Sequence, residues 1–189
     1  ALLPKDRGRV PVNWAVLHGE QETGATLHVM DIKPDHGDIV EQSAVPILGD
    51  DTAHEVFQKV TVAAEIALAR ALPKLIAGTA SFTAQDFSRG GYFGGRKPED
   101  GRIAPEAGAQ AIHNLVRAVA PPYPGAFFEA QGRRILIERT LKMAGTQAPA
   151  DRFRVFARDQ ALWLHAADGG CLRILALRLD GAPCDAAAF

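Results

Sequence analysis

The chain has 189 residues, of which 47% are apolar and 23% are charged, and its formal net charge is −1. This apolar content excludes a disordered chain, and the near-zero charge gives no general case for nucleic acid or an acidic membrane surface as partner. The two cysteines, Cys171 and Cys184, are too few for a disulfide framework and do not have metal-ligand spacing. Because no apolar run has the length of a membrane span and no leader begins the sequence, we expect a cytoplasmic protein.

The first fifty residues predict a short helix followed by two strands. Pro11 suits the start of a helix and Gly19 suits its end, so residues 11–19 are predicted to be helical. Small or polar residues alternate with apolar ones over residues 23–30, which predicts a strand. A second strand is predicted over residues 38–48, with Pro46 at its end or on a sheet edge.

A long helix is predicted next, from a capping box at Thr52 and Glu55 to a stop at Gly78. Its apolar positions are Val56, Val60, Ala63, Ala67, Leu68, Leu72, Leu75 and Ile76. Residues 84–105 are rich in glycine and proline and are therefore predicted to be a linker. A further helix is predicted over residues 106–120, ended by the prolines that follow it.

The remainder of the chain predicts short strands separated by glycine or Asp-Gly turns. They cover residues 126–130, 134–141, 153–157, 161–166 and 171–179. Five short strands at this spacing indicate a small β-barrel. The predicted organisation is an α/β unit over 1–83, a linker over 84–105, and a helix with a small β domain over 106–189.

The stretch "VMDIKPDHGDIVEQ" concentrates charge between the two first strands. Asp31, Asp35 and Asp38 lie there with His36, and open α/β sheets place their sites at strand ends. On spacing alone, an ordinary aspartate-rich turn accounts for such a cluster, and a catalytic carboxylate is the alternative. A magnesium or calcium site from these four residues is a further alternative, although the spacing matches no EF-hand loop.

Two other segments leave alternatives open. The glycine-rich run at residues 90–96 suits a mobile linker, or a backbone that approaches a phosphate, although it is neither a P-loop nor a dinucleotide fingerprint. The basic run at residues 5–9 suits carboxylate or phosphate binding, or a solvated loop. His18 and His28 are interpreted as structural, and no hydrolase or zincin motif is present.

The first forty residues resemble the folate-dependent formyltransferases. The matching positions are Leu2-Leu3-Pro4, Arg7-Gly8, Pro11, Gly19, Thr23-Gly24-Ala25-Thr26 and Asp35-His36-Gly37. Asn13-Trp14 and the segment "HNLVRAVAPPYPGAF" resemble the nucleotide-sugar branch, in particular its members that formylate UDP-4-amino-4-deoxy-L-arabinose in lipid A modification. Methionyl-tRNA formyltransferases are near relatives, and a non-catalytic binding module is the alternative from another class.

The resemblance implies a fold, a co-substrate and a set of site residues. The fold is the C-terminal part of a Rossmann-like formyltransferase domain followed by an OB-like β-barrel. The reaction uses 10-formyltetrahydrofolate and a small nucleotide-sugar substrate, without a metal or a membrane, and with nucleic acid only under the tRNA alternative. The implied site residues are Asp35 for catalysis, Arg9, Asp31, Ile32, Lys33 and Pro34 for the folate, and Asn13 and Trp14 for the sugar nucleotide.

The resemblance also predicts what this sequence lacks. In the family, the catalytic asparagine and histidine belong to an Asn-x-His segment just before Leu-Leu-Pro, so we expect the chain to be a fragment without the first half of the catalytic domain. Two departures from the family pattern affect the site. Asp6 stands where the family has an aromatic residue, and His36 replaces a small residue beside Asp35.

Overall fold

The computed structural model describes residues 1–147 and 153–189, without the side chains of 144–147, and divides the chain into two compact units. Unit 1 is Ala1–Arg96 and unit 2 is Lys97–Phe189. The boundary falls inside the segment 84–105 that the composition predicts to be a linker, while the domain bounds themselves remain a prediction. Within the described part of the chain, no helix is both long enough and apolar enough to cross a membrane.

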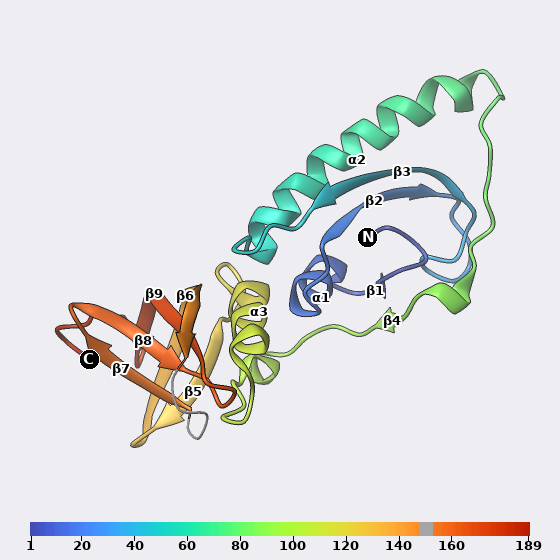
Figure 1. Cartoon of the computed structure of the whole chain (residues 1–189). Helices are drawn as coiled ribbons and strands as arrows, with labels where there is room; N and C mark the ends of the chain where they lie inside the picture. The colour runs from blue at the N-terminus through green and yellow to red at the C-terminus, as the bar shows by residue number, and fades with distance from the viewer. Residues whose placement is uncertain (148–152) are drawn as a thin grey trace. The chain divides into compact units, whose positions relative to one another are not determined.

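Unit 1 is built on an antiparallel hairpin covered by a long helix (Figure 1). Strand β2 (Glu22–His28) pairs with β3 (Ile39–Pro46), close to the two predicted strands. Pro46 ends β3, as expected of a residue that cannot donate a backbone hydrogen bond to a ladder. The helix α2 (Ala53–Ile76) packs on both strands.

The start of α2 confirms the predicted capping box, whereas its buried face differs from the predicted one. The Thr52 hydroxyl accepts the Glu55 backbone N–H at 3.3 Å, and the Glu55 carboxylate accepts the Thr52 N–H at 2.7 Å. The face against the hairpin consists largely of small side chains: Ala53, Val56, Ala63, Ala67 and Ala71. Alanines let the helix backbone approach the strands closely. Several larger residues of the predicted apolar face therefore do not lie between the helix and the hairpin. Those are Leu68, Leu72, Leu75 and Ile76, which are exposed.

A second strand pair fixes the glycine-rich segment. Strand β1 (Arg7–Gly8) pairs in parallel with β4 (Tyr92–Phe93), which follows the short 3₁₀ helix η1 (Phe87–Arg89). Gly8 has φ +105°, and a Cβ there would lie 2.2 Å from the Phe93 carbonyl oxygen, so this close approach requires glycine. The short helix α1 (Pro11–Leu17) follows β1, as predicted. The interpretation of residues 90–96 as a mobile linker is therefore wrong for β4, because backbone pairing holds it.

Unit 2 begins with the 3₁₀ helix η2 (Pro98–Gly101) and the helix α3 (Ala109–Val119). The helix starts three residues later than predicted. Its first backbone N–H, that of Ala109, donates to both carboxylate oxygens of Asp168 at 3.1 Å, so a distant loop supplies the helix cap. The apolar residues Ile112, Val116 and Val119 are buried, and α3 packs mainly on β6.

The rest of unit 2 is an antiparallel sheet with strand order β5-β6-β9-β8-β7. The strands are β5 (Ala126–Ala130), β6 (Arg133–Gln147), β7 (Arg154–Arg158), β8 (Ala161–His165), β9 (Gly170–Leu179) and β10 (Ala182–Pro183), which pairs with β9. The five predicted strands are confirmed and β10 was missed. The sheet forms a half-barrel, which is consistent with a small OB-like domain.

Candidate active site

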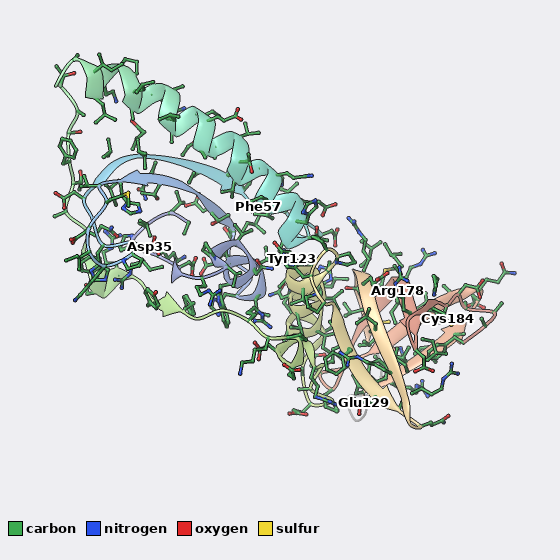
Figure 2. All side chains as sticks on the ribbon, turned by 180° about the vertical axis from the view of Figure 1, so that it is seen from behind. Asp35, Phe57, Tyr123, Glu129, Arg178 and Cys184 are labelled. Atoms are coloured by element: carbon green, nitrogen blue, oxygen red, sulfur yellow. The ribbon has the colours of Figure 1, made fainter. Side chains whose placement is uncertain are left out.

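Asp35 lies in the loop that joins β2 to β3, inside unit 1 (Figure 2). Its Oδ2 accepts the backbone N–H of Gly8 at 2.8 Å, and its Oδ1 lies 3.8 Å from Nε2 of His28. The carboxylate side chain keeps 29% of its surface exposed. A carboxylate held by a main-chain amide, facing an imidazole and open to a ligand, can accept a proton during a reaction.

The main chain of the loop is fixed from several sides. Asp35 has φ +60°, a conformation that aspartate and asparagine adopt more readily than most residues. The Gln85 amide donates to the carbonyl oxygens of Asp35 at 3.0 Å and of Gly37 at 2.6 Å. The Val29 N–H donates to the Asp38 carbonyl at 2.9 Å, which closes the base of the loop. The position of the Asp35 carboxylate is therefore set by backbone contacts.

An arginine and two aromatic rings pack beside the same loop. The Arg7 guanidinium lies 4.5 Å from the centroid of the Phe87 ring, and the His36 ring lies 4.4 Å from that ring. Nη1 of Arg7 lies 3.5 Å from Nε2 of His36, and because an arginine only donates, this histidine nitrogen is placed to accept. The sequence did not predict that Arg7 and Phe87 pack beside the Asp35 loop. Arg7 is only 8% exposed, and no sequence pattern indicates this burial.

The residues predicted to contact the folate lie on two exposed segments. Asp31, Ile32, Lys33 and Pro34 are all exposed and precede Asp35 in the same loop. The Asp31 side chain accepts the N–H of Ile32 at 2.6 Å, which shapes this turn. Arg9 is exposed just after β1, with its guanidinium against the Gly95 main chain.

The two residues predicted to recognise the sugar nucleotide lie on α1 in different environments. Asn13 is only 5% exposed. Trp14 is half-buried, and its ring stacks on Phe93 at 5.1 Å, while the Arg96 guanidinium lies 4.9 Å above it. The Trp14 Nε1 donates to the Gly94 carbonyl at 3.0 Å, so the tryptophan joins α1 to the glycine-rich segment.

Comparison with models of protein families shows which family this chain belongs to. A formyl transferase model matches residues 1–72, and a model of the formyl transferase C-terminal domain matches residues 96–189. The chain belongs to the formyltransferase family. The two matches fall on unit 1 and unit 2 respectively, which confirms the α/β fold with N-terminal and C-terminal formyltransferase domains.

Solved formyltransferase structures share the fold. An N-formyltransferase from Helicobacter canadensis, in complex with folinic acid and dTDP-3-aminofucose, is 21% identical with a TM-score of 0.75, over 91% of this chain and 62% of its own. WlaRD, a sugar 3N-formyl transferase in the presence of dTDP and 5-N-formyl-THF, is 20% identical with a TM-score of 0.76, over 91% and 61%. The methionyl-tRNA formyltransferase from Clostridium thermocellum is 25% identical with a TM-score of 0.62, over 77% and 62%. The chain thus spans about three fifths of the length of these relatives.

The four residues of the metal alternative are not grouped as ligands in the described structure. Across residues 1–147 and 153–189, no three or more histidine, cysteine, aspartate or glutamate side chains are grouped so as to hold a metal ion. Asp31, Asp35, His36 and Asp38 are therefore close in sequence without forming a ligand set. His36 instead faces Arg7 and Phe87, as described above.

Asp6, the other departure from the family pattern, predicts a pH dependence of stability. Burial raises the pKa of the Asp6 carboxyl above its ordinary value of 3.8, and the Glu20 carboxylate raises it further, against the opposing charge of Lys5. The folded state then binds more protons than the unfolded state just above pH 3.8, so the free energy of unfolding falls as the pH rises through this window. The ionised carboxylate therefore destabilises the fold at pH 7.

We expect Asp6→Asn to raise the urea midpoint of unfolding at pH 7, because it removes this buried charge while asparagine tolerates the φ of +51° at this position. The gain should shrink as the pH falls towards 4. Unfolding followed by circular dichroism between pH 7 and pH 4 measures it, with the exposed Asp38→Asn as the matched control. An equal gain at every pH, or none, would contradict the argument.

Proposed function

We propose that this chain supplies the aspartate of a formyltransferase active site. The reaction is the transfer of a formyl group from 10-formyltetrahydrofolate to the 4-amino group of UDP-4-amino-4-deoxy-L-arabinose, in lipid A modification. The observation that carries the proposal is the Asp35 carboxylate, held by the Gly8 amide at 2.8 Å and still partly exposed, in the loop that matches the family motif. We propose this reaction for a formyltransferase of the relatives' full length that contains this chain, because the chain itself covers only about three fifths of that length.

The chemistry explains why such a site needs a carboxylate. When the sugar amine attacks the formyl carbon, the tetrahedral oxyanion needs hydrogen-bond donors, which the asparagine and a protonated histidine of the Asn-x-His segment supply. A nearby carboxylate favours the imidazolium form of that histidine and can accept the proton that the amine loses. Asp35 performs both tasks in this proposal. Collapse of the tetrahedral intermediate then breaks the bond between the formyl carbon and N10, which takes a proton from the imidazolium and leaves as tetrahydrofolate.

Two surfaces of unit 1 carry the substrate assignments. Arg9 is exposed and follows Gly8, whose N–H donates to Asp35, and the exposed residues 31–34 directly precede Asp35 in the chain. Both segments suit the folate, and structures of similar proteins contain folinic acid, 5-N-formyl-THF or tetrahydrofolic acid. The Trp14 ring is packed against Phe93 and the Arg96 guanidinium, so we assign Trp14 to the sugar nucleotide on the family resemblance alone. We retain Asn13 as the weaker sugar-nucleotide residue, because it is buried.

Formylation of methionyl-tRNA is the second candidate, since a methionyl-tRNA formyltransferase shares the fold. A non-catalytic binding module is the candidate from a different class, because the half-barrel sheet of unit 2 is consistent with an OB-like domain. The salt dependence of substrate binding distinguishes a methionyl-tRNA formyltransferase from a nucleotide-sugar formyltransferase. Binding of a tRNA weakens steeply as the salt concentration rises, while binding of a small nucleotide sugar weakens much less.

The testing experiment uses this chain within a formyltransferase of its relatives' full length, with an Asn-x-His segment before Leu2-Leu3-Pro4. We would measure formyl transfer from 10-formyltetrahydrofolate to UDP-4-amino-4-deoxy-L-arabinose, a dTDP-linked 3-amino sugar and methionyl-tRNA in parallel. Turnover greatest with the UDP sugar is the expected result. Preference for the dTDP sugar would overturn the substrate while keeping the reaction, and turnover with the tRNA alone would favour the second candidate. No turnover with any acceptor would sink the enzyme proposal.

A further inference from the structure

His28 faces the Asp35 carboxylate in unit 1 and has no part in the reaction proposed above. Nε2 of His28 lies 3.8 Å from Oδ1 of Asp35, while Oδ2 is held by the Gly8 N–H. This separation is longer than a hydrogen bond, but contacts between reacting groups are often long in the free protein and shorten when a substrate binds. The two side chains keep 22% and 29% of their surfaces exposed, so the pair is also open to water.

An irregularity in the hairpin lies where the imidazole turns towards the loop. His28 is the last residue of β2, and the register shifts between Leu27 and His28. Leu27 is paired with Glu41, whereas His28 is paired with Ile39, so that Val40 is an extra residue of β3. Such bulges bend a strand and re-aim its side chains, and they are frequent beside active sites. An alternating sequence pattern does not reveal a bulge, and the pattern alone therefore led to the interpretation of His28 as structural.

The second ring nitrogen of His28 determines which tautomer is present. Nδ1 lies 2.8 Å from the carbonyl oxygen of Val29. Because a carbonyl oxygen only accepts, Nδ1 carries the hydrogen and donates it. In the neutral imidazole, Nε2 then presents its lone pair to Asp35. A protonated Asp35 carboxyl group can donate to that lone pair, so the geometry suits acceptance of a proton from Asp35.

Formylation of an amine releases a proton that must reach water. An alkyl amine is largely protonated near neutral pH, and its ammonium group carries three protons. The formamide product keeps one of them and N10 of tetrahydrofolate gains another, so one proton leaves to the solvent in each turnover. Asp35 accepts a proton from the amine in the proposed function, and it must lose that proton before the next turnover.

We propose that His28 is a positioning residue of the formyl transfer site, which takes the proton from Asp35 and passes it to water. The hydrogen of the neutral Asp35 carboxyl group moves from Oδ1 to Nε2 of His28, which leaves a carboxylate beside an imidazolium. The imidazolium is partly exposed and releases the proton to water. Histidine suits this task because its charge ordinarily changes near neutral pH. The inference rests on the proposed function, since it requires Asp35 to accept a proton during formyl transfer.

The test compares His28→Asn with the wild type in a formyltransferase of the relatives' full length that contains this chain. The asparagine amide can donate to the Val29 carbonyl in place of Nδ1, but it has no group at the position of Nε2. We expect kcat to fall about tenfold or more, with the KM for 10-formyltetrahydrofolate within about twofold of the wild type. Added imidazole should restore part of kcat, because a free base can accept the proton that His28 no longer takes. The matched control is His54→Asn, at an exposed histidine of α2, and it should leave both constants unchanged.

The outcomes separate this inference from the proposed function. An unchanged kcat of His28→Asn in an active enzyme would overturn the inference and leave the assignment of Asp35 intact. A loss of kcat that imidazole does not restore would show a purely structural role for His28 and would overturn it as well. A wild-type enzyme without turnover would overturn the proposed function and the inference together.

A spectroscopic measurement tests the geometry of His28 without any turnover. Imidazole ¹⁵N spectra of the same full-length protein report which ring nitrogen carries the hydrogen in the neutral form. We expect the hydrogen on Nδ1, donated to the Val29 carbonyl. A hydrogen on Nε2 would leave no lone pair towards Asp35 and would overturn the inference.

Discussion

Asp35→Asn is expected to lower the rate of formyl transfer by about 10²–10⁴-fold, the usual contribution of a general acid or base. Asparagine is nearly isosteric, tolerates the φ of +60° at this position, and can still accept the Gly8 N–H through its side-chain oxygen. It cannot accept the proton of the amine, and it carries no charge to favour an imidazolium. The fold should therefore persist while the chemistry is lost.

The assay is initial rate of formyl transfer by the protein that carries the Asn-x-His segment, with saturating 10-formyltetrahydrofolate. Asp38→Asn is the matched control, because Asp38 lies in the same loop and is exposed. The control should retain nearly all of the rate. If Asp35→Asn is as active as the control, the catalytic assignment of Asp35 is wrong and the binding-module alternative becomes the better one.

The elements of this fold were predictable wherever a local pattern dictates them. The capping box at Thr52, the glycine-punctuated strands of unit 2 and the proline at the end of β3 all act through neighbouring residues, and all are confirmed. The buried face of α2 was not predictable, because burial there depends on how closely the helix approaches the hairpin. That approach favours Ala63, Ala67 and Ala71 over larger residues nearby.

In the candidate site too, local sequence motifs were predictable and contacts between distant residues were not. Asp35 was found from the motif that contains it, whereas the groups that position its loop come from distant parts of the chain. Gln85 lies 50 residues from Asp35 in sequence, and the Phe87 ring reaches Arg7 across 80 residues. Such contacts have no periodicity or spacing in the sequence. The parallel pair of β1 with β4, two residues on each side, is hidden for the same reason.

Gly37→Ala is expected to destabilise the chain by about 3 kcal/mol and to displace the loop that carries Asp35. A Cβ at Gly37 would lie 1.8 Å from the Val29 carbonyl oxygen and 2.7 Å from its carbon, so the backbone itself must move. Gln85 binds the carbonyl oxygens of Asp35 and Gly37, which transmits the displacement to the carboxylate. Urea unfolding followed by circular dichroism measures the loss of stability.

Gly49→Ala serves as the control, because a Cβ at that exposed glycine would meet nothing within 4 Å. Its free energy of unfolding should stay within about 0.5 kcal/mol of the wild type. A Gly37→Ala variant as stable as this control would show that the loop yields freely, and the carboxylate would then not be held in place by the main chain. A stable but inactive Gly37→Ala variant would instead show that the loop position matters for the reaction more than for folding, and would place the rigidity of this turn within the catalytic role of Asp35.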